Sequence, residues 1–299
     1  MPENEWYRGI LIPVTTPFDP VTGDIAPISF RENLRGWLAR PVDGIVLFGS
    51  TGEGALLDLE EKLKLLEFAR DLLPPRLPLI AGVSAESTRS AIAQATLLGR
   101  AGADALLVHP PAYFGAVLTP AALREHFLAL ADASPVPVIV YHVPKYTHVV
   151  LEPGLIRELA RHPNIVAVKD SSGDLKRLAD YTLACGDACK VLVGNGALLY
   201  SALELGAAGG IVALGLLATE GCARIYSLYR AGRSREAGEV QERLAPAHRE
   251  IVARFGPAGV KAALDLLGYT GGPTRPPLRN LNDKERRHLA HVLQRAGVE

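Results

Sequence analysis

The sequence predicts an α/β protein, a (β/α)8 barrel with a C-terminal helical extension. Short apolar runs rich in β-branched residues recur along the chain, and helical patterns lie between them. Each run is apolar nearly throughout, as a parallel strand covered on both faces requires. Eight such strand–helix units over roughly 230 residues match the size of this barrel.

The predicted strands are regularly spaced, which favours a closed barrel over its rival, a doubly wound open sheet. No linker-like segment interrupts this region. The strands are predicted at residues 9–14, 44–49, 77–83, 105–110, 136–143, 165–169, 190–194 and 210–214.

Helix signals occupy the segments between the strands. Thr119 is a typical N-cap and Pro120 suits the first helical position. Gly102 and Gly206 are typical of the residue that follows a helix. Helices are predicted at residues 57–73, 88–101, 120–131 and 197–205.

After about Ala231 the pattern changes to helices with no strands between them. A rigid connector rich in Gly and Pro lies within this part of the chain. We therefore divide the chain into a catalytic barrel, residues 1–231, and a helical extension packed on it, residues 232–299. The helices of the extension are predicted at residues 235–255, 258–267 and 283–296.

The composition excludes several classes of protein. The 299 residues are 48% hydrophobic and the formal net charge is +0, which argues against a nucleic-acid or membrane-surface partner. The three cysteines match neither a metal site nor a disulfide framework, and Cys222 is predicted to be a small buried hydrophobe. Residues 1–6 are too polar for a signal peptide, and no apolar run is long enough to span a membrane, so a cytoplasmic protein is expected.

Lys169 has surroundings unlike those of the other lysines. Four apolar residues, 165–168, run directly into it and a polar turn follows, whereas Lys62 lies in a helical, charged segment. Burial disfavours the ammonium form and lowers the pKa, which leaves an amine that can attack a carbonyl and form a Schiff base. The alternative is a structural role, in which Lys169 caps the strand and pairs with Asp170 or Asp174.

A glycine-rich loop follows the second predicted strand, at residues 49–54. In a barrel, reactive side chains gather at the carboxyl ends of the strands. Backbone amides of this loop, with the hydroxyls of Ser50 and Thr51, could hold a substrate carboxylate. A dinucleotide loop is the alternative, although the spacing is neither G-x-G-x-x-G nor a Walker loop. A further interpretation makes one of the two hydroxyls a helix N-cap.

The other strand ends supply Tyr141 and Ile211, and Tyr113 follows the fourth strand. Tyr141 is either a core tyrosine or, because it ends a strand, a functional one. His142 points away from Tyr141 by strand alternation, so we assign a structural role to it and to His109. No cluster of carboxylates and histidines that could bind a metal is found at the strand ends.

Three of these segments together resemble the signatures of the dihydrodipicolinate synthase / N-acetylneuraminate lyase family: GSTGE at 49–53, YHVP at 141–144 and VKDSSG at 168–173. The resemblance covers nearly the whole chain. It implies a (β/α)8 barrel with a helical extension, usually a homotetramer (a dimer of dimers). It also implies an enzyme that needs no metal or organic cofactor and forms a lysine Schiff base with pyruvate or another 2-oxo acid.

The resemblance also implies roles for individual residues. Lys169 would be the Schiff-base lysine, and Tyr141 the general acid and base that moves protons to and from the substrate. Ser50 and Thr51, in the loop that begins at Gly49, would hold the pyruvate carboxylate. Ser50 would also relay protons.

Two further matches lie at other strand ends. Ile211 would contact the pyruvate moiety. Tyr113 matches a tyrosine that reaches into the site of a neighbouring subunit, although Ala112 replaces the aromatic residue that often precedes it.

Two positions distinguish this chain from the synthases of the family. The synthases bind the carboxylate of their aldehyde with an arginine where this chain has Tyr146, preceded by Lys145, and they usually carry threonine at the position of Ser50. The segments that look most like 4-hydroxy-2-oxoglutarate aldolase are 134–138, 162–166 and 255–278.

The predicted function is reversible aldol cleavage of a 4-hydroxy-2-oxo acid to pyruvate and an aldehyde, as in 4-hydroxy-2-oxoglutarate aldolase. Lys169 would form an iminium at C2 so that the C3–C4 bond can break, and Tyr141 would take the C4 hydroxyl proton. One alternative is 4-hydroxy-tetrahydrodipicolinate (dihydrodipicolinate) synthase, which condenses pyruvate with aspartate semialdehyde. The others are a 2-keto-3-deoxy sugar acid aldolase and a non-catalytic barrel that binds 2-oxo acids.

Overall fold

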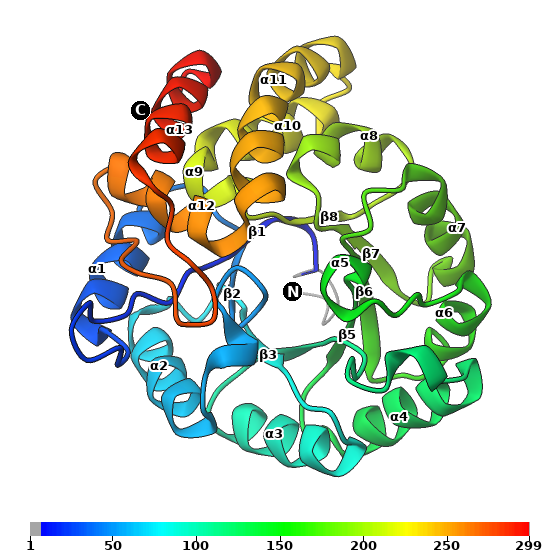
Figure 1. Cartoon of the computed structure of the whole chain (residues 1–299). Coiled ribbons are helices and arrows are strands. Elements are labelled where there is room, and N and C mark those ends of the chain that lie inside the picture. Colours follow the sequence, from blue (N-terminus) through cyan, green and yellow to red (C-terminus); the bar gives the residue numbers. More distant parts are fainter. Residues whose placement is uncertain (1–6, 299) are drawn as a thin grey trace.

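Eight parallel strands form one closed barrel in the computed structural model, which describes residues 7–298 (Figure 1). Each strand pairs with its neighbour in sequence, and β8 closes the barrel on β1, with Gly209 opposite Gly9. The predicted fold is confirmed. The strands are β1 (Gly9–Pro13), β2 (Gly44–Leu47), β3 (Leu79–Val83), β4 (Ala105–Val108), β5 (Val138–His142), β6 (Ile165–Asp170), β7 (Lys190–Val193) and β8 (Gly209–Ile211).

Helices form a ring outside the strands, and Figure 1 looks along the barrel at this ring. Thr119 accepts a hydrogen bond from the Ala122 backbone at 3.2 Å, which confirms the predicted N-cap. The outer helices are α1 (Pro27–Leu38), α2 (Leu59–Leu72), α3 (Thr88–Arg100), α4 (Pro120–Ala133), α6 (Pro153–Leu159), α7 (Leu175–Cys185), α8 (Leu199–Glu204) and α10 (Thr219–Arg230). Shorter helices follow several strand ends: η1 (Gly54–Leu56), η2 (Gly115–Val117), α5 (Pro144–Thr147), η3 (Gly196–Leu198) and α9 (Leu214–Leu217).

The strands separate two hydrophobic cores. Successive strand residues point to opposite faces, so Leu11 faces the barrel interior while Ile10 and Ile12 pack against the helices outside. Val46, Ile80 and other apolar side chains fill the interior. Because the interior is packed, a substrate must bind above it, at the carboxyl ends of the strands.

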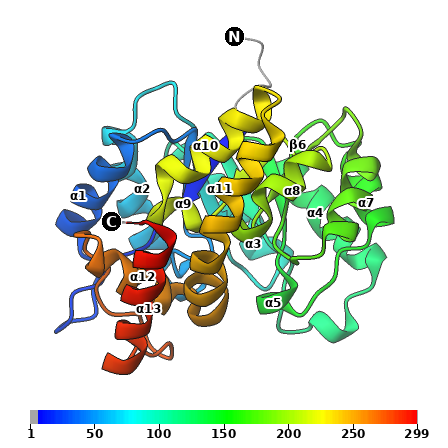
Figure 2. The same ribbon diagram turned by 90° about the horizontal axis from the view of Figure 1, so that it is seen from above.

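The C-terminal part contains α11 (Ser234–Ala247), the π-helix η4 (His248–Ala253), α12 (Arg254–Leu266) and α13 (Asp283–Ala296). Figure 2 shows α12 and α13 at the same end of the barrel as α5. The predicted break between two helices, between residues 255 and 258, is confirmed as a kink at Gly256 within α12. Only Gly256, with φ of 59°, departs from helical geometry there. The division of the chain at residue 231 stays a prediction.

Residues 1–6, on which the expected absence of a signal peptide rests, lie outside the described residues. Between residues 7 and 298, no helix has both the length and the apolar character needed to cross a bilayer. Cys222 is fully buried, as predicted.

Lys62 lies in a helix, as predicted, but its burial is not evident from the sequence. The structure leaves Lys62 of α2 only 2% exposed, and burial lowers its pKa to about 8. The neighbouring Glu60 and Glu61 suggest a charged helix face in the sequence. The rotation of the helix instead turns Lys62 inward, on the same side as the buried Leu65 and Leu66.

Glu53 of the glycine-rich loop and Lys261 of α12 form a buried ion pair. Lys261 Nζ lies 2.5 Å from Glu53 Oε1, and the two side chains are 1% and 0% exposed. Lys261 Nζ also donates to the carbonyl of Pro273 at 2.7 Å, and the backbone N–H of Arg275 donates to Glu53 Oε2 at 2.9 Å. The loop after β2 is therefore joined to the C-terminal segment by groups that have little access to water.

Replacing Lys261 with methionine should lower the free energy of unfolding by about 3–5 kcal/mol, because the Glu53 carboxylate stays buried without its cation. Urea unfolding measures this change. The double variant Lys261→Met, Glu53→Gln should recover part of the loss, since it removes the buried charge.

The matched control is Arg235→Gln, which breaks an exposed ion pair with Glu239 and should change the unfolding free energy little. Equal losses in the two single variants would contradict a special role for the buried pair.

Candidate active site

Tyr141 and Lys169 lie opposite one another on neighbouring strands. The β5–β6 register pairs Tyr141 with Lys169 and His142 with Asp170. Tyr141 and Lys169 are 5% and 3% exposed, and Lys169 Nζ lies 4.1 Å from the centre of the Tyr141 ring. The two residues that the sequence singled out are therefore brought into contact at the carboxyl ends of their strands.

Burial sets the protonation of this pair. Loss of water lowers the pKa of Lys169 below its ordinary value of 10.5, although Tyr141 opposes the shift. Burial alone would raise the pKa of Tyr141, but the charge of Lys169 and hydrogen bonds from Ser50 and Ser171 outweigh it and lower that pKa. Each of the two groups thus shifts the pKa of the other.

The alternative structural role of Lys169 is not found, because both candidate aspartates are engaged elsewhere. Asp170 accepts hydrogen bonds from His142 Nδ1 at 2.8 Å and from the hydroxyl of Ser172 at 2.9 Å. Asp174 caps α7 by accepting from the backbone N–H of Lys176 at 2.9 Å. Neither aspartate forms an ion pair with Lys169.

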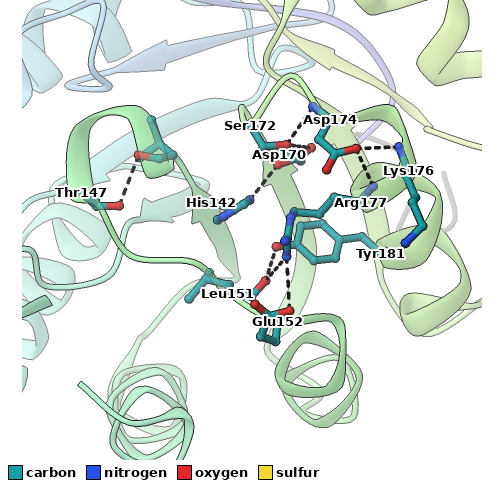
Figure 3. Close-up of polar contacts among 11 residues, drawn as sticks. His142, Thr147, Leu151, Glu152, Asp170, Ser172, Asp174, Lys176, Arg177 and Tyr181 are labelled. Atoms are coloured by element: carbon teal, nitrogen blue, oxygen red, sulfur yellow. Dashed lines mark hydrogen bonds and ion pairs between the residues drawn. The ribbon is translucent and has the colours of Figure 1, made fainter. Parts of the chain in front are cut away.

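The outward faces of β5 and β6 carry a buried polar network, shown in Figure 3. The His142 and Asp170 side chains are 0% and 3% exposed, and the His142 ring meets the Tyr181 ring edge-on at 5.6 Å. The Tyr181 hydroxyl donates to the carbonyl of Leu151. His142 therefore has the structural role predicted for it, and it ties the ends of both strands to α7.

The glycine-rich loop is held in a strained form next to this pair. Ser50 Oγ lies 3.4 Å from Tyr141 Oη, within hydrogen-bond distance. Phe48 and Glu53 adopt φ values of 58° and 55°, which non-glycine residues rarely do and which are concentrated at functional sites. Gly54 is required because a Cβ there would lie 1.9 Å from the Phe48 carbonyl oxygen.

The prediction that Ser50 or Thr51 caps a helix is wrong. The residue before η1 is Glu53, and Asp58 caps α2 through a capping box with Glu61. Neither hydroxyl of the loop therefore caps a helix, because η1 lies between the loop and the start of α2.

A cavity of about 230 Å³ lies at the carboxyl end of the barrel. Five of the predicted site residues line it: Ser50, Thr51, Tyr141, Lys169 and Ile211. Gly49 lines an adjoining, more apolar cavity of about 290 Å³. Tyr113 lines neither cavity and is 81% exposed, so its proposed contact with a second subunit stays a prediction.

Sequence reasoning missed several residues of this cavity. Ser171 lies beside Tyr141, and Gly194 makes room for it, since a Cβ there would lie 1.8 Å from Ser171 Oγ. His248 of η4 also lines the cavity. In the sequence, His248 is only a histidine in a predicted helical segment that ends near Pro257, and this does not mark it as a residue of the cavity. Within residues 7–298, no group of three or more potential ligands could hold a metal.

Comparisons with known proteins agree with this geometry. The model of the dihydrodipicolinate synthetase family matches residues 6–296. The 4-hydroxy-tetrahydrodipicolinate synthase of Syntrophus aciditrophicus is 32% identical over 98% of this chain and 99% of its own. The enzyme of that name from Methanoculleus marisnigri is 34% identical, over 97% and 100% of the two chains.

A solved structure is similar over the same length. The dihydrodipicolinate synthase of Acinetobacter baumannii, crystallised with pyruvate, is 29% identical with a TM-score of 0.93, covering 98% of this chain and 100% of its own. These relatives carry the name of the predicted alternative, the synthase, and not that of 4-hydroxy-2-oxoglutarate aldolase. With its closed barrel and buried lysine–tyrosine pair, the chain belongs to the dihydrodipicolinate synthetase family, whose members are lysine Schiff-base lyases.

Proposed function

We propose that the chain joins pyruvate to an aldehyde, or cleaves the product, through a Schiff base on Lys169. The observation that carries this proposal is the buried Lys169 amine, whose pKa is lowered by desolvation and which faces Tyr141 in an open cavity. A desolvated amine of this kind is the nucleophile that carbonyl substrates require.

In the condensation direction, the Lys169 amine attacks the C2 carbonyl of pyruvate and water leaves, which gives an iminium. Loss of a proton from C3 gives an enamine, and its C3 then attacks the aldehyde carbon. Tyr141 accepts and returns the protons, with Ser50 as the relay 3.4 Å away. Ser50 and Thr51 hold the pyruvate carboxylate, and hydrolysis of the iminium releases the product and the free lysine.

For the acceptor, we propose first the reaction of the 4-hydroxy-tetrahydrodipicolinate synthases, in which pyruvate condenses with aspartate semialdehyde. The names of the relatives support this choice. Aldol cleavage of 4-hydroxy-2-oxoglutarate, with glyoxylate as the aldehyde, is the second candidate. It is favoured by Tyr146, which lines the cavity where the synthases carry arginine. We further propose a cytoplasmic homotetramer in which Tyr113 reaches a neighbouring site.

The substitution Lys169→Ala should abolish trapping of pyruvate by borohydride and lower turnover by roughly a thousandfold or more, since no other group replaces the nucleophile. Peptide mass mapping locates the reduced adduct in the unaltered protein. The matched control is Lys176→Ala, on the exposed first turn of α7, and it should trap pyruvate normally. An adduct that persists in Lys169→Ala would remove Lys169 from this role.

The rate of trapping should rise with pH around a midpoint below 10.5, the ordinary lysine pKa, because burial lowers the pKa of the Lys169 amine. A small lysine derivative, trapped over the same pH series, supplies the reference. Tyr141 raises the pKa of Lys169, so Tyr141→Phe should move the midpoint to still lower pH. A midpoint equal to that of the free amine would show that the site does not desolvate Lys169.

The rate of consumption and the product formed with each aldehyde distinguish the two candidate acceptors. With pyruvate supplied, aspartate semialdehyde should be consumed faster than glyoxylate if the synthase reaction is correct, and chromatography with mass detection identifies each product. Faster consumption of glyoxylate would instead support the aldol reaction of 4-hydroxy-2-oxoglutarate. Trapping without turnover of any aldehyde would instead indicate a barrel that binds 2-oxo acids.

A further inference from the structure

Glu53 connects the buried ion pair to the loop that carries Ser50. The backbone N–H of Glu53 donates to the carbonyl of Ser50 at 3.2 Å. Glu53 adopts a φ of 55°, which is rare for a residue with a side chain and persists where the surrounding structure holds it in place. The interactions of the Glu53 side chain therefore also fix the position of the Ser50 backbone.

Both oxygens of the Glu53 carboxylate are held by the C-terminal part of the chain. Lys261 Nζ of α12 lies 2.5 Å from Oε1, and the backbone N–H of Arg275 donates to Oε2 at 2.9 Å. The Glu53 and Lys261 side chains are 0% and 1% exposed, so water does not replace either of them as a partner. These contacts therefore hold Glu53 in its left-handed conformation.

The barrel itself holds the neighbouring part of the loop. Thr16, which follows β1, donates its hydroxyl to the carbonyl of Gly52 at 2.8 Å, and this hydrogen bond is buried. The loop thus has one anchor in the barrel, at Gly52, and another in the C-terminal part, at Glu53. Ser50 is joined to the second anchor, because its carbonyl accepts from the N–H of Glu53.

The contact between Ser50 and Tyr141 is sensitive to the position of the loop. Their hydroxyl oxygens are 3.4 Å apart, whereas hydrogen bonds between hydroxyl groups are usually about 2.7–2.8 Å long. A small outward movement of Ser50 would therefore break the contact. Misplacement of a reacting group by about 1 Å can slow a reaction by about a hundredfold, even when the change that causes it lies far from the chemistry.

We propose that Glu53 and Lys261 are positioning residues for proton transfer: their ion pair holds Ser50 close enough to Tyr141 to act as its relay. Lys261 lines neither of the two cavities, so it acts through Glu53 and the loop and not on the substrate. The C-terminal part is therefore needed for catalysis as well as for stability. This inference rests on the proposed function, in which Ser50 relays protons for Tyr141.

The test follows the exchange of the C3 hydrogens of pyruvate for deuterium in D2O, which proton NMR measures without any aldehyde. Exchange requires the Lys169 iminium and the proton transfer that gives the enamine. The rate at saturating pyruvate is expressed per site that borohydride traps, so that unfolded chains do not count. Glu53→Gln should lower this rate by roughly 10- to 100-fold, because Ser50 loses its position.

A double-mutant cycle with Ser50→Ala shows whether the ion pair acts through Ser50. In a chain that already lacks the Ser50 hydroxyl, Glu53→Gln should change the rate by less than about threefold, because there is no relay left to misplace. Lys261→Met should give the same pattern from the other side of the ion pair, so the test does not depend on the folding of one variant. Losses that multiply in the double variants would overturn the inference, as would single variants that keep the full rate per site.

The matched control is Glu61→Gln, which breaks an ion pair between Arg275 and α2. It loosens the same C-terminal segment but leaves the pair of Glu53 and Lys261 in place, so it should lower stability and keep the rate per site. An equal loss of rate in Glu61→Gln would also overturn the inference, since any loosening of the segment would then suffice. Failure of the unaltered chain to trap pyruvate would instead reject the proposed function.

Discussion

The register between β5 and β6 is the constraint on which the site depends. It sets Tyr141 opposite Lys169 inside the barrel and, one residue later, His142 opposite Asp170 outside it. A slip by one residue would exchange the two faces and turn Lys169 into the helix layer. The outward pair stabilises the correct register, because neither of its side chains can bind water instead. The same pair of strands thus carries a structural hydrogen bond on its outer face and the contact between Lys169 and Tyr141 on its inner face.

The C-terminal helices complete the site from the opposite side. Glu53 and Lys261 join α12 to the loop that carries Ser50 and Thr51, so this wall of the cavity is held by a buried ion pair. Gly256 leaves room for Tyr146, whose hydroxyl oxygen lies 3.1 Å from the place where a Cβ would be. The cavity therefore depends on both the barrel and the segment after residue 231, wherever a domain boundary is drawn.

The two halves of the proposed reaction have different physical requirements. The pyruvate half needs a desolvated amine and a hydroxyl relay, which the barrel interior supplies and which any acceptor would use. The acceptor half depends on the open rim, where Lys145 of α5 donates to the Ala253 carbonyl of η4. Family membership therefore predicts the first half, whereas the second half depends on residues that line the open end of the cavity, among them Tyr146 and Lys145.

The sequence by itself determined the barrel and the Lys169–Tyr141 pair, because apolar strand runs and the residues that end them are local patterns that barrel topology brings together. It did not reveal that Lys62 is buried, since neighbouring glutamates say nothing about which way packing rotates a helix. It also left His248 unnoticed, because a histidine in a helix carries no local sign of the cavity it faces. Only the tertiary structure decided that the Ala253 carbonyl would meet Lys145. That meeting depends on how the C-terminal helices fold back over the carboxyl end of the barrel, across about a hundred residues of intervening chain, and long-range packing of this kind leaves no periodicity in the sequence.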